Sequence, residues 1–420
     1  MQLLLAACVV AGTGLAIDRW RQPAVIPAEP SQLRSAYGPA NYQTALAASD
    51  AAVTGARDHL ALSPGEWLRM EGLARALASR YRLAGDLADL AEADALLERA
   101  VAAAPDPSGP TLTRASVLLM LHRLEQASAM LDRFDRQAIA LQRGQIPAAE
   151  RFYGEARALG DTPGMRLRAG LLLARTGRMD LARAAVDGAL LAPGQQPAAL
   201  SEIALQRASL AYATGDIANA GRWITAADRI FPGRWLTRSW LAQQKAVEGD
   251  RAGAIRDYTA LARETRKPEV IDALAHLLRL EGRGIESRDW ARISAAAWAE
   301  RMAIDPLAFA SHAAEHEITL GSPQKALALA RSDAAARPFG PALVLLARTQ
   351  TLTGDPAGSL ATLAQAESQG WRTSLLYLEK AVALELLGRG EEALAARRMA
   401  QEYNPLALDP AMQAVWFGHE

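Results

Sequence analysis

The sequence has little of what a disulfide-stabilised, thiol-dependent or nucleic-acid-binding protein needs. Its 420 residues include a single cysteine, Cys8, in an N-terminal stretch that we expect to be removed, so the mature chain would form no disulfide and use no thiol. The 46 Lys and Arg residues are balanced by 46 Asp and Glu residues, and no basic run occurs. Binding to phosphates usually needs a basic excess. We therefore expect no nucleic-acid partner.

Motifs of the common enzyme classes are also missing. The chain has no P-loop and no serine in a Gly-x-Ser-x-Gly elbow. Gly282-Arg-Gly284 and Gly388-Arg-Gly390 are glycine pairs, but neither follows a strand, as a nucleotide-binding fingerprint would. No stretch alternates polar and apolar residues as a half-buried strand does. These absences predict an all-α, non-catalytic protein without a cofactor.

The N-terminus resembles an export signal. Residues 1–17 are apolar and uncharged, a length that is marginal for a membrane span and sufficient for the core of a signal peptide. We expect this segment to be a signal peptide or an N-terminal anchor, and the protein to be exported to a bacterial periplasm. Cys8 follows Leu5-Ala6-Ala7, which resembles a lipoprotein box. A retained anchor, a lipoprotein and a cytoplasmic chain are the alternatives.

Length and composition favour an architecture that grows by repetition. A single hydrophobic core usually stops growing near about 300 residues, and half of this longer chain is hydrophobic, with Ala prominent, which suits short, closely packed helices. Residues 18–40 contain four prolines and no helical period, which is typical of a linker. We expect degenerate helical repeats over 41–136, clearer repeats over 137–405, and a C-terminal capping segment over 406–420.

An internal repeat is the main signal. Seven glycines, each followed by a polar residue and spaced 33 to 39 residues apart, are typical of the turn after a first helix: Gly177, Gly215, Gly249, Gly282, Gly321, Gly354 and Gly388. Seven residues before them stand small residues: Gly170, Ala208, Ala242, Ala275, Ala314, Ala347 and Ala381. Small side chains at these positions let a second helix cross closely over the first.

This spacing resembles the tetratricopeptide repeat (TPR), a helical hairpin of about 34 residues. The clearest copy runs from Tyr377 through Ala381, Gly388 and Ala393 to Pro405. The resemblance implies an all-α, right-handed superhelical solenoid of antiparallel helix pairs, seven to nine in number. It also implies protein–protein interaction as the function.

Three features depart from the family pattern. The tryptophan that occurs early in the family's repeat is absent from every copy. The segment after Gly282 is about five residues longer than the repeat requires, so we expect Arg288-Asp289-Trp290 to lie in an extended turn. Only 22 residues separate His122 from Gly144, so one helix there would be missing or shared.

The concave face is where the resemblance implies binding of an extended or helical segment of a protein or peptide partner, since the first helix of each pair lines it. The inward-facing positions would be Ser209, Tyr212, Gln243, His276, Arg279, Glu315, Arg348 and Glu385. The Lys and Asn set with which co-chaperones of the family clamp a terminal carboxylate is not found, although Arg175, Arg279 and Arg348 could pair with acidic groups. The alternative for each position is ordinary solvated helix surface. The sequence assigns no oligomeric state.

One metal-binding pattern competes with this interpretation. His312-Ala-Ala-Glu315-His316 matches the H-x-x-E-H motif of inverted zinc proteases, in which two His residues on one helix face hold the metal. The repeat already explains the position, since Ala314 is a small packing residue and Gly321 a turn glycine. A metal-dependent hydrolase is therefore kept only as an alternative function.

A third possibility is a structural subunit of an envelope complex that makes its contacts through the outer surface. Tryptophans bear on the choice, because they are enriched in binding hot spots. We expect Trp235 to fill space between adjacent repeats. We expect Trp416 and Phe417 to cover the last repeat, because a terminal unit must hide its open apolar face.

Overall fold

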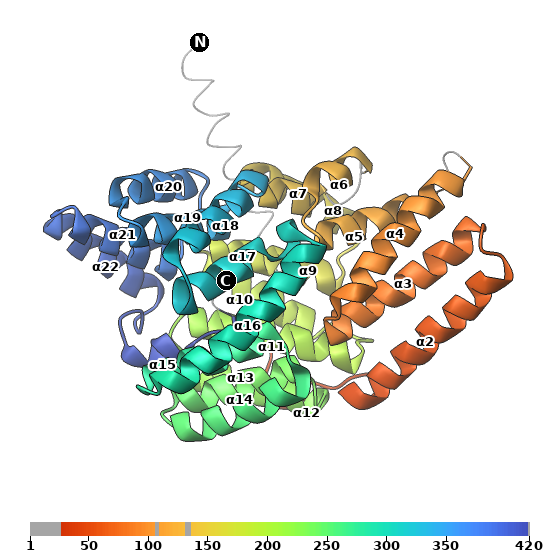
Figure 1. Cartoon of the computed structure of the whole chain (residues 1–420), viewed down its shortest axis with the longest axis horizontal. Coiled ribbons are helices and arrows are strands. Elements are labelled where there is room, and N and C mark those ends of the chain that lie inside the picture. Colours follow the sequence, from red (N-terminus) through yellow and green to blue (C-terminus); the bar gives the residue numbers. More distant parts are fainter. Residues whose placement is uncertain (1–26, 106–108, 131–135, 419–420) are drawn as a thin grey trace, which may run out of the picture.

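The computed structural model describes residues 27–105, 109–130 and 136–418. Across these residues the chain forms 21 α-helices, two short 3₁₀-helices and no strand (Figure 1). The predicted signal peptide or anchor, residues 1–17, lies outside the described residues. None of the described helices combines the length and the apolar character needed to cross a bilayer.

Five helices form the N-terminal part, after the short 3₁₀-helix η1 (Pro30–Gln32). They are α2 (Tyr42–Leu62), α3 (Trp67–Ala84), α4 (Leu87–Ala103), α5 (Thr111–Met120) and α6 (Leu124–Met130). Consecutive helices pack against each other, with α3 against α4 and α5 against α6. The degenerate region therefore contains helix pairs of its own.

Eight further pairs continue the solenoid. They are α7 (Arg136–Gln142) with α8 (Ile146–Leu159), α9 (Pro163–Arg175) with α10 (Met179–Leu190), α11 (Pro197–Ala213) with α12 (Ile217–Ile230), α13 (Trp235–Val247) with α14 (Arg251–Thr265), α15 (Pro268–Leu280) with α16 (Gly284–Ile304), α17 (Pro306–Leu320) with α18 (Pro323–Ala336), α19 (Gly340–Leu352) with α20 (Pro356–Ser368), and α21 (Ser374–Leu386) with α22 (Gly390–Tyr403). The 3₁₀-helix η2 (Pro410–Ala414) follows.

The described chain thus has ten helix pairs, α3 to α22, where we expected seven to nine. The difference arises between His122 and Gly144, where we expected a helix to be missing or shared. Both helices of that interval, α6 and α7, are present but only seven residues long. A helix of two turns is too short to show a clear hydrophobic period.

The turns and helix crossings follow the repeat pattern. Six of the seven turn glycines have a positive φ, between 72° and 100°, which L side chains rarely adopt. Gly321 differs, with φ −125°. The small residues seven positions earlier are all buried. At Gly170 a Cβ atom would lie 2.9 Å from Val186 Cγ2 of the partner helix, so close crossing does require small residues there.

The second helix after Gly282 corrects one expectation. The five extra residues do not form an extended turn: α16 begins at Gly284 and runs for 21 residues, with Arg288-Asp289-Trp290 inside it. Ser287 lies five residues after the turn glycine, where other second helices carry a small residue such as Ala254 or Ala326. Its hydroxyl donates to the carbonyl of Ala275 at 2.8 Å. The insertion therefore lengthens a helix that is already fixed to its partner.

The expected linker is also partly different. Residues 27–40 of the predicted 18–40 linker lie against the solenoid. Ala28 and Leu33 are buried in the same core cluster as α10 to α15. The amide of Ala36 donates to the carbonyl of Gln195 at 3.0 Å. The Pro-rich sequence correctly predicted no α-helix here, where only the short 3₁₀-helix η1 occurs, but it did not predict that the segment packs against the solenoid.

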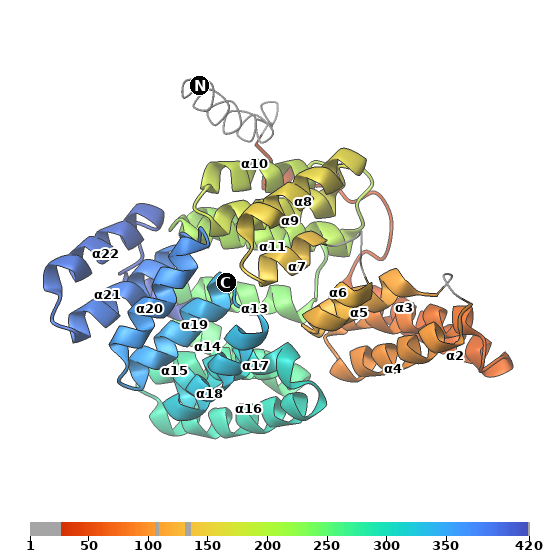
Figure 2. The ribbon, with the colours of Figure 1, turned by 90° about the horizontal axis from the view of Figure 1, so that it is seen from above.

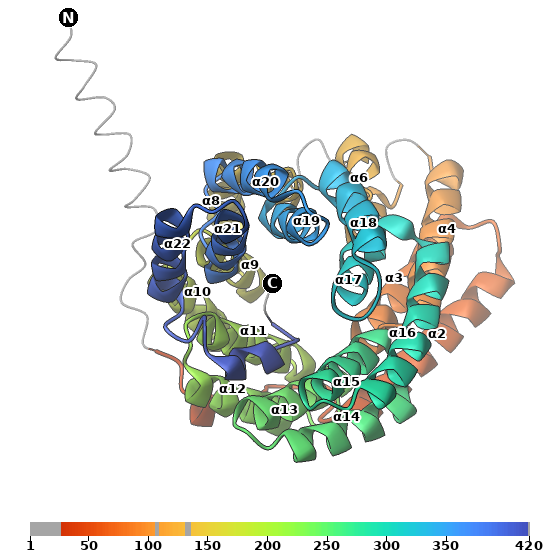
Figure 3. The ribbon, with the colours of Figure 1, turned by 60° about the vertical axis from the view of Figure 1, so that its left-hand side comes forward.

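The solenoid closes on itself into a ring. In Figure 3 the first helix of each later pair (α11, α15, α17, α19, α21) faces the inside, and the second helices lie outside. The turn after α5 lies directly against the start of α17: Arg123 forms an ion pair with Asp305 at 2.8 Å, and His122 Nδ1 lies 3.3 Å from the carbonyl of Leu307. At the other end, the amide of Arg372 donates to the carbonyl of Arg175 at 3.0 Å, beside α9 (Figure 2).

Three of the contacts between early and late parts of the chain join residues at a similar separation in sequence. The pairs Arg123–Asp305 and His122–Leu307 are 182 and 185 residues apart, and Lys267 Nζ meets the carbonyl of Gly85 at a separation of 182. These separations correspond to between five and six repeats of about 34 residues. One superhelical turn therefore lies directly against the next.

Burial at this contact lowers the pKa of one histidine, His122. The imidazole of His122 lies between α17 and α18, and burial together with the nearby Arg337 guanidinium lowers its pKa to about 3. His122 also adopts a left-handed backbone, with φ 58°. The folded protein therefore holds this histidine neutral at the ring contact.

Candidate functional site

The C-terminal segment, residues 404–418, lies inside the ring. It leaves α22 at Asn404, whose side chain is buried and donates to the carbonyl of Tyr212 on α11 at 3.2 Å. Its 3₁₀-helix η2 packs against α13 and α15 (Figure 3). We name residues 409–418 the C-terminal tail. The tail thus crosses the interior from the last pair to the middle of the solenoid.

This position corrects the expectation that Trp416 and Phe417 cover the last repeat. Both pack into the core cluster of α11 to α15 instead. The apolar end of the last pair stays open, with Leu386 62% and Leu394 57% exposed. The sequence pattern identified an apolar C-terminal segment but not the surface that it covers, because a segment of this length reaches either one.

Three of the predicted binding residues hold the tail. Gln243, which is fully buried, accepts from the amides of Trp416 and Phe417 at 2.7 and 2.6 Å and donates to the carbonyl of Phe417 at 3.0 Å. Ser209 donates its hydroxyl to the carbonyl of Gly418 at 2.8 Å. These side chains therefore form hydrogen bonds with the backbone of the tail and not with its side chains.

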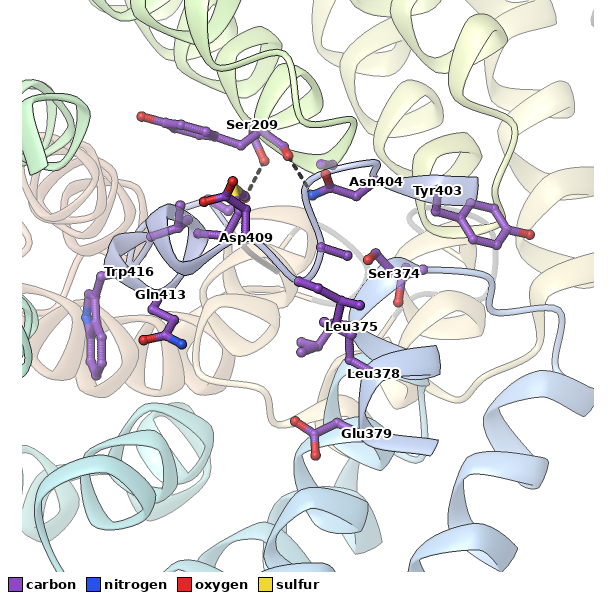
Figure 4. Close-up of a pocket in the computed structure, with 18 of the residues that line it drawn as sticks. Ser209, Ser374, Leu375, Leu378, Glu379, Tyr403, Asn404, Asp409, Gln413 and Trp416 are labelled. Atoms are coloured by element: carbon purple, nitrogen blue, oxygen red, sulfur yellow. Dashed lines mark hydrogen bonds between the residues drawn. The ribbon is translucent and has the colours of Figure 1, made fainter. Parts of the chain in front are cut away.

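The third residue, His276, makes the contact at the other end of the tail. Its Nε2 lies 2.7 Å from the carbonyl of Gln413, and its ring packs on Trp416 with the centroids 5.4 Å apart. Both Gln413 and Trp416 are visible in Figure 4. The helices α11, α13 and α15 each contribute one polar residue to the same segment, at positions that the repeat spacing places on the concave face.

Beside the tail lies an open cavity of about 680 Å³. Its walls come from α9, α11, α15, α17, α19, α21 and α22 and from the tail itself. Leu375, Leu378 and Glu379 of α21 face it in Figure 4. This volume lies in the range of pockets that bind small ligands or a few residues of a peptide.

Six of the eight predicted partner-binding residues line the cavity: Ser209, Tyr212, His276, Arg279, Glu315 and Arg348. Gln243 belongs to the tail site. Glu385 lines neither site, although its carboxylate pairs at 2.6 Å with Arg397, which does line the cavity. Position within the repeat therefore located the concave face but did not decide which side chains turn away from it.

The charged groups of the cavity are mainly basic. Five arginines line it (Arg175, Arg279, Arg348, Arg372, Arg397), against three acidic residues (Glu315, Glu379, Asp409). Burial raises the pKa of Glu379. The Arg348 guanidinium, 3.6 Å away, lowers this pKa but offsets the effect of burial only in part. The cavity thus has a net positive charge that favours acidic groups on a ligand.

Two of these arginines are already oriented by backbone groups. The guanidinium of Arg279 donates to the carbonyl of Thr319 at 2.6 Å, and that of Arg372 donates to the carbonyls of Glu367 and Trp371. Neutral acceptors hold a guanidinium in place without cancelling its charge. Sequence reasoning missed Arg372 and Glu379. Arg372 lies between α20 and α21, outside the repeat frame that was used to choose inward positions.

The two histidines of the H-x-x-E-H motif contact other side chains of the protein. His316 is buried, and its Nδ1 lies 2.7 Å from Oδ1 of Asp272 on α15. The other oxygen of Asp272 accepts from the indole Nε1 of Trp298 at 2.7 Å. His312 stacks on the other side of the network, against Trp298, with the centroids 5.9 Å apart.

The two histidines thus serve different contacts, one in the core and one over an indole. No group of three or more His, Cys, Asp or Glu side chains suited to a metal ion occurs in residues 27–105, 109–130 and 136–418. The repeat frame that placed Ala314 at a helix crossing is confirmed, since Ala314 is fully buried.

Trp235 fills the space that we expected. It is partly buried against the core cluster of α10 to α15, with Lys267 Nζ 4.8 Å above its ring. The other edge of the indole faces Gly85, in the turn after α3. Trp235 therefore contacts both the adjacent repeat and the next superhelical turn, and we assign it no binding role.

Comparison with known proteins finds distant structural similarity and no relative by sequence. No protein-family model and no curated protein matches the chain. Among solved structures, a TPR protein from Parabacteroides merdae is 14% identical, with a TM-score of 0.35 over 60% of this chain and 100% of its own. Yeast Tom70 is 14% identical, with a TM-score of 0.34 over 84% of this chain and 93% of its own. At these scores the assignment depends on the repeat and the helix pairing of the chain itself, which make it a TPR-like, all-α solenoid.

Proposed function

We propose that this protein is a non-catalytic scaffold that binds an extended segment of a partner protein inside its ring. The observation that supports this most is the tail: the concave face already holds ten residues of polypeptide through Gln243, Ser209 and His276. A surface that satisfies the backbone groups of one extended segment has the geometry to do so for another.

The open cavity supplies the rest of the binding surface. Its basic lining, including Arg279 and Arg348, favours a partner segment that carries Asp or Glu residues. Apolar side chains of α21, such as Leu378 and Val382, would contact the segment's apolar residues. A mixture of apolar walls and a few oriented polar groups is typical of ligand sites.

Photo-crosslinking tests the proposal in the cells that make the protein. A photo-reactive amino acid replaces either Val382, which lines the cavity and is 42% exposed, or Ile285, which is 72% exposed on an outer helix. We expect a discrete adduct from position 382 and none from position 285. Charge reversal by Arg279→Glu or Arg348→Glu should reduce the adduct at least about fivefold, a change of about 1 kcal/mol.

A matched control is Arg263→Glu, since Arg263 is an exposed arginine of the outer helix α14. It changes the net charge equally but not the cavity. If Arg263→Glu reduces the adduct as much as Arg279→Glu, the effect is long-range electrostatics and the cavity is not the binding site.

A second candidate function, a structural subunit, is favoured by the open end of the solenoid. Leu386, Leu387 and Leu394 form an exposed apolar surface there, which isolated solenoids usually cover with a cap. A partner docked on this surface would be lost in a Leu386→Asp, Leu394→Asp variant and unaffected by Arg279→Glu. The two candidate functions therefore predict opposite results for the same pair of variants.

We further propose that the protein acts in a bacterial cell envelope, either free in the periplasm or anchored by its N-terminus. The support is the apolar, uncharged sequence of residues 1–17. N-terminal sequencing of the protein from an envelope fraction should find a start shortly after residue 17 if the segment is removed, and the original N-terminus if it is retained as an anchor. Labelling with a radioactive fatty acid that Cys8→Ser abolishes would assign a lipoprotein instead.

A further inference from the structure

The tail is held mainly through its backbone. Gln243 bonds both an amide and a carbonyl of Phe417, and a second amide from Trp416, while Ser209 and His276 reach the carbonyls of Gly418 and Gln413. Backbone contacts of this kind are available to any extended segment. They fix where a segment lies but do not select its sequence.

Selectivity comes from the last two positions. The Phe417 ring is 9% exposed and stacks on Tyr258, with the centroids 6.5 Å apart. Gly418 has φ 77°, and a Cβ atom there would lie 2.2 Å from Cη2 of Trp240. This part of the site therefore requires an aromatic residue followed by glycine.

The chain before the tail is anchored separately. Asn404 is buried, with its amide group on the carbonyl of Tyr212, and its side-chain oxygen accepts from the amide of Leu406 at 2.9 Å. Release of the tail would leave this anchor in place. The open cavity adjoins both the tail and the anchor, so an incoming segment has a route to the tail site.

We propose that the Gln243 site recognises an extended partner segment with an aromatic–glycine sequence, and that the tail is its built-in competitor, displaced when the partner binds. This inference rests on the proposed function, because the partner enters the same ring. A tethered competitor acts at an effective concentration of about 1 mM or more. The protein with its tail in place should therefore bind such segments weakly, and removal of the competition should strengthen binding.

The test uses the full-length chain and a fluorescent, C-terminally amidated peptide with the sequence of residues 409–418, followed by fluorescence polarisation. Phe417→Ser in the protein weakens the tail without changing the groove. We expect it to bind the peptide at least about tenfold more tightly than the wild type. Adding Gln243→Ala to this variant should weaken binding at least about tenfold, because the peptide then loses its three backbone hydrogen bonds.

A second variant controls for loss of the fold. Gly418→Val retains Phe417 and acts by straining the left-handed backbone and by forcing a branched side chain against Trp240. Circular dichroism checks the helix content of both variants. Equal peptide affinity of wild type and both variants would overturn the proposal. Loss of helix content in both variants would also overturn it, because the tail would then be an integral part of the core.

Three further outcomes are decisive. A wild-type dimer that Phe417→Ser converts to a monomer would assign the tail to exchange between copies, against the proposal. Failure of peptide binding with a persistent crosslink from position 382 would refute this inference and leave the proposed function standing. Peptide binding without any crosslink would contradict the proposed function, and with it the displacement of the tail by a cellular partner.

Discussion

The buried network around Asp272 gives the sharpest prediction, because it decides what the H-x-x-E-H motif does. Asp272 is 1% exposed, and its two oxygens meet His316 Nδ1 and Trp298 Nε1, each at 2.7 Å. Asp272→Ala leaves two buried polar groups without a partner, each of which costs about 1 to 3 kcal/mol. We expect the free energy of unfolding in urea to fall by about 4 kcal/mol.

A double-mutant cycle separates this network from a general loss of packing. His316→Ala and Asp272→Ala should be strongly non-additive, with a coupling of about 2 kcal/mol, because either change alone already breaks the shared contact. Asp180→Ala is the matched control: its carboxylate is 94% exposed and pairs only with Arg183 at the surface, so a loss below about 1 kcal/mol is expected.

The reasoning is refuted if Asp272→Ala costs no more than Asp180→Ala, or if the cycle shows no coupling. Either result would mean that Asp272 does not hold His316. The histidine would then be available for another role, and the zinc hypothesis would regain support.

The remaining predictions concern metal content, pH and two glycines. Purified protein dialysed against zinc and then buffer should hold no stoichiometric zinc by elemental analysis, since His316 is committed to a buried carboxylate; one tightly held ion per chain would contradict this. His122 has a folded pKa of about 3 against about 6.5 unfolded, so the unfolded state takes up the proton as the pH falls and stability decreases. Between pH 7.5 and pH 5, the free energy of unfolding in urea should fall by about 2 kcal/mol more for the wild type than for His122→Asn. Asn is chosen because it tolerates the left-handed backbone. Gly340→Ala should destabilise by about 2 kcal/mol because its Cβ would lie 1.9 Å from Trp371. Gly390→Ala, also at a helix start but with open space around it, should be neutral or slightly stabilising. A melting temperature of Gly340→Ala equal to that of Gly390→Ala would contradict the role of the close contact with Trp371.

The helix pairs could be predicted from the sequence because their determinants are local. A turn glycine such as Gly215 and a small residue such as Ala208 lie seven positions apart, and both act within one hairpin. The exception at Gly321 has a visible cause. A Cβ there would lie 2.1 Å from Oε2 of Glu317, which caps the amide of Ser322, so the glycine is needed for space and not for positive φ.

The tail site could be predicted only in part. Ser209, Gln243 and His276 were chosen because they face inward on three successive first helices, which the repeat spacing determines. The identity of the segment that they bind was missed. Backbone hydrogen bonds do not depend on the sequence of the bound segment, so the sequence does not indicate them. The residues Trp416-Phe417-Gly418 alone suit a cap as well as a groove. The contact between Arg123 and Asp305 was missed for a related reason, since its partners are 182 residues apart.

The closed ring changes how this protein should fold. In an open solenoid each repeat contacts only its neighbours, so unfolding can begin at an end and proceed one repeat at a time. Here contacts such as Arg123–Asp305 join the first repeats to the later ones. Long-range contacts of this kind raise the contact order and slow folding, because a long loop must close before they form. Stepwise fraying from the N-terminus would also uncover α17, so the two halves should unfold as one cooperative unit.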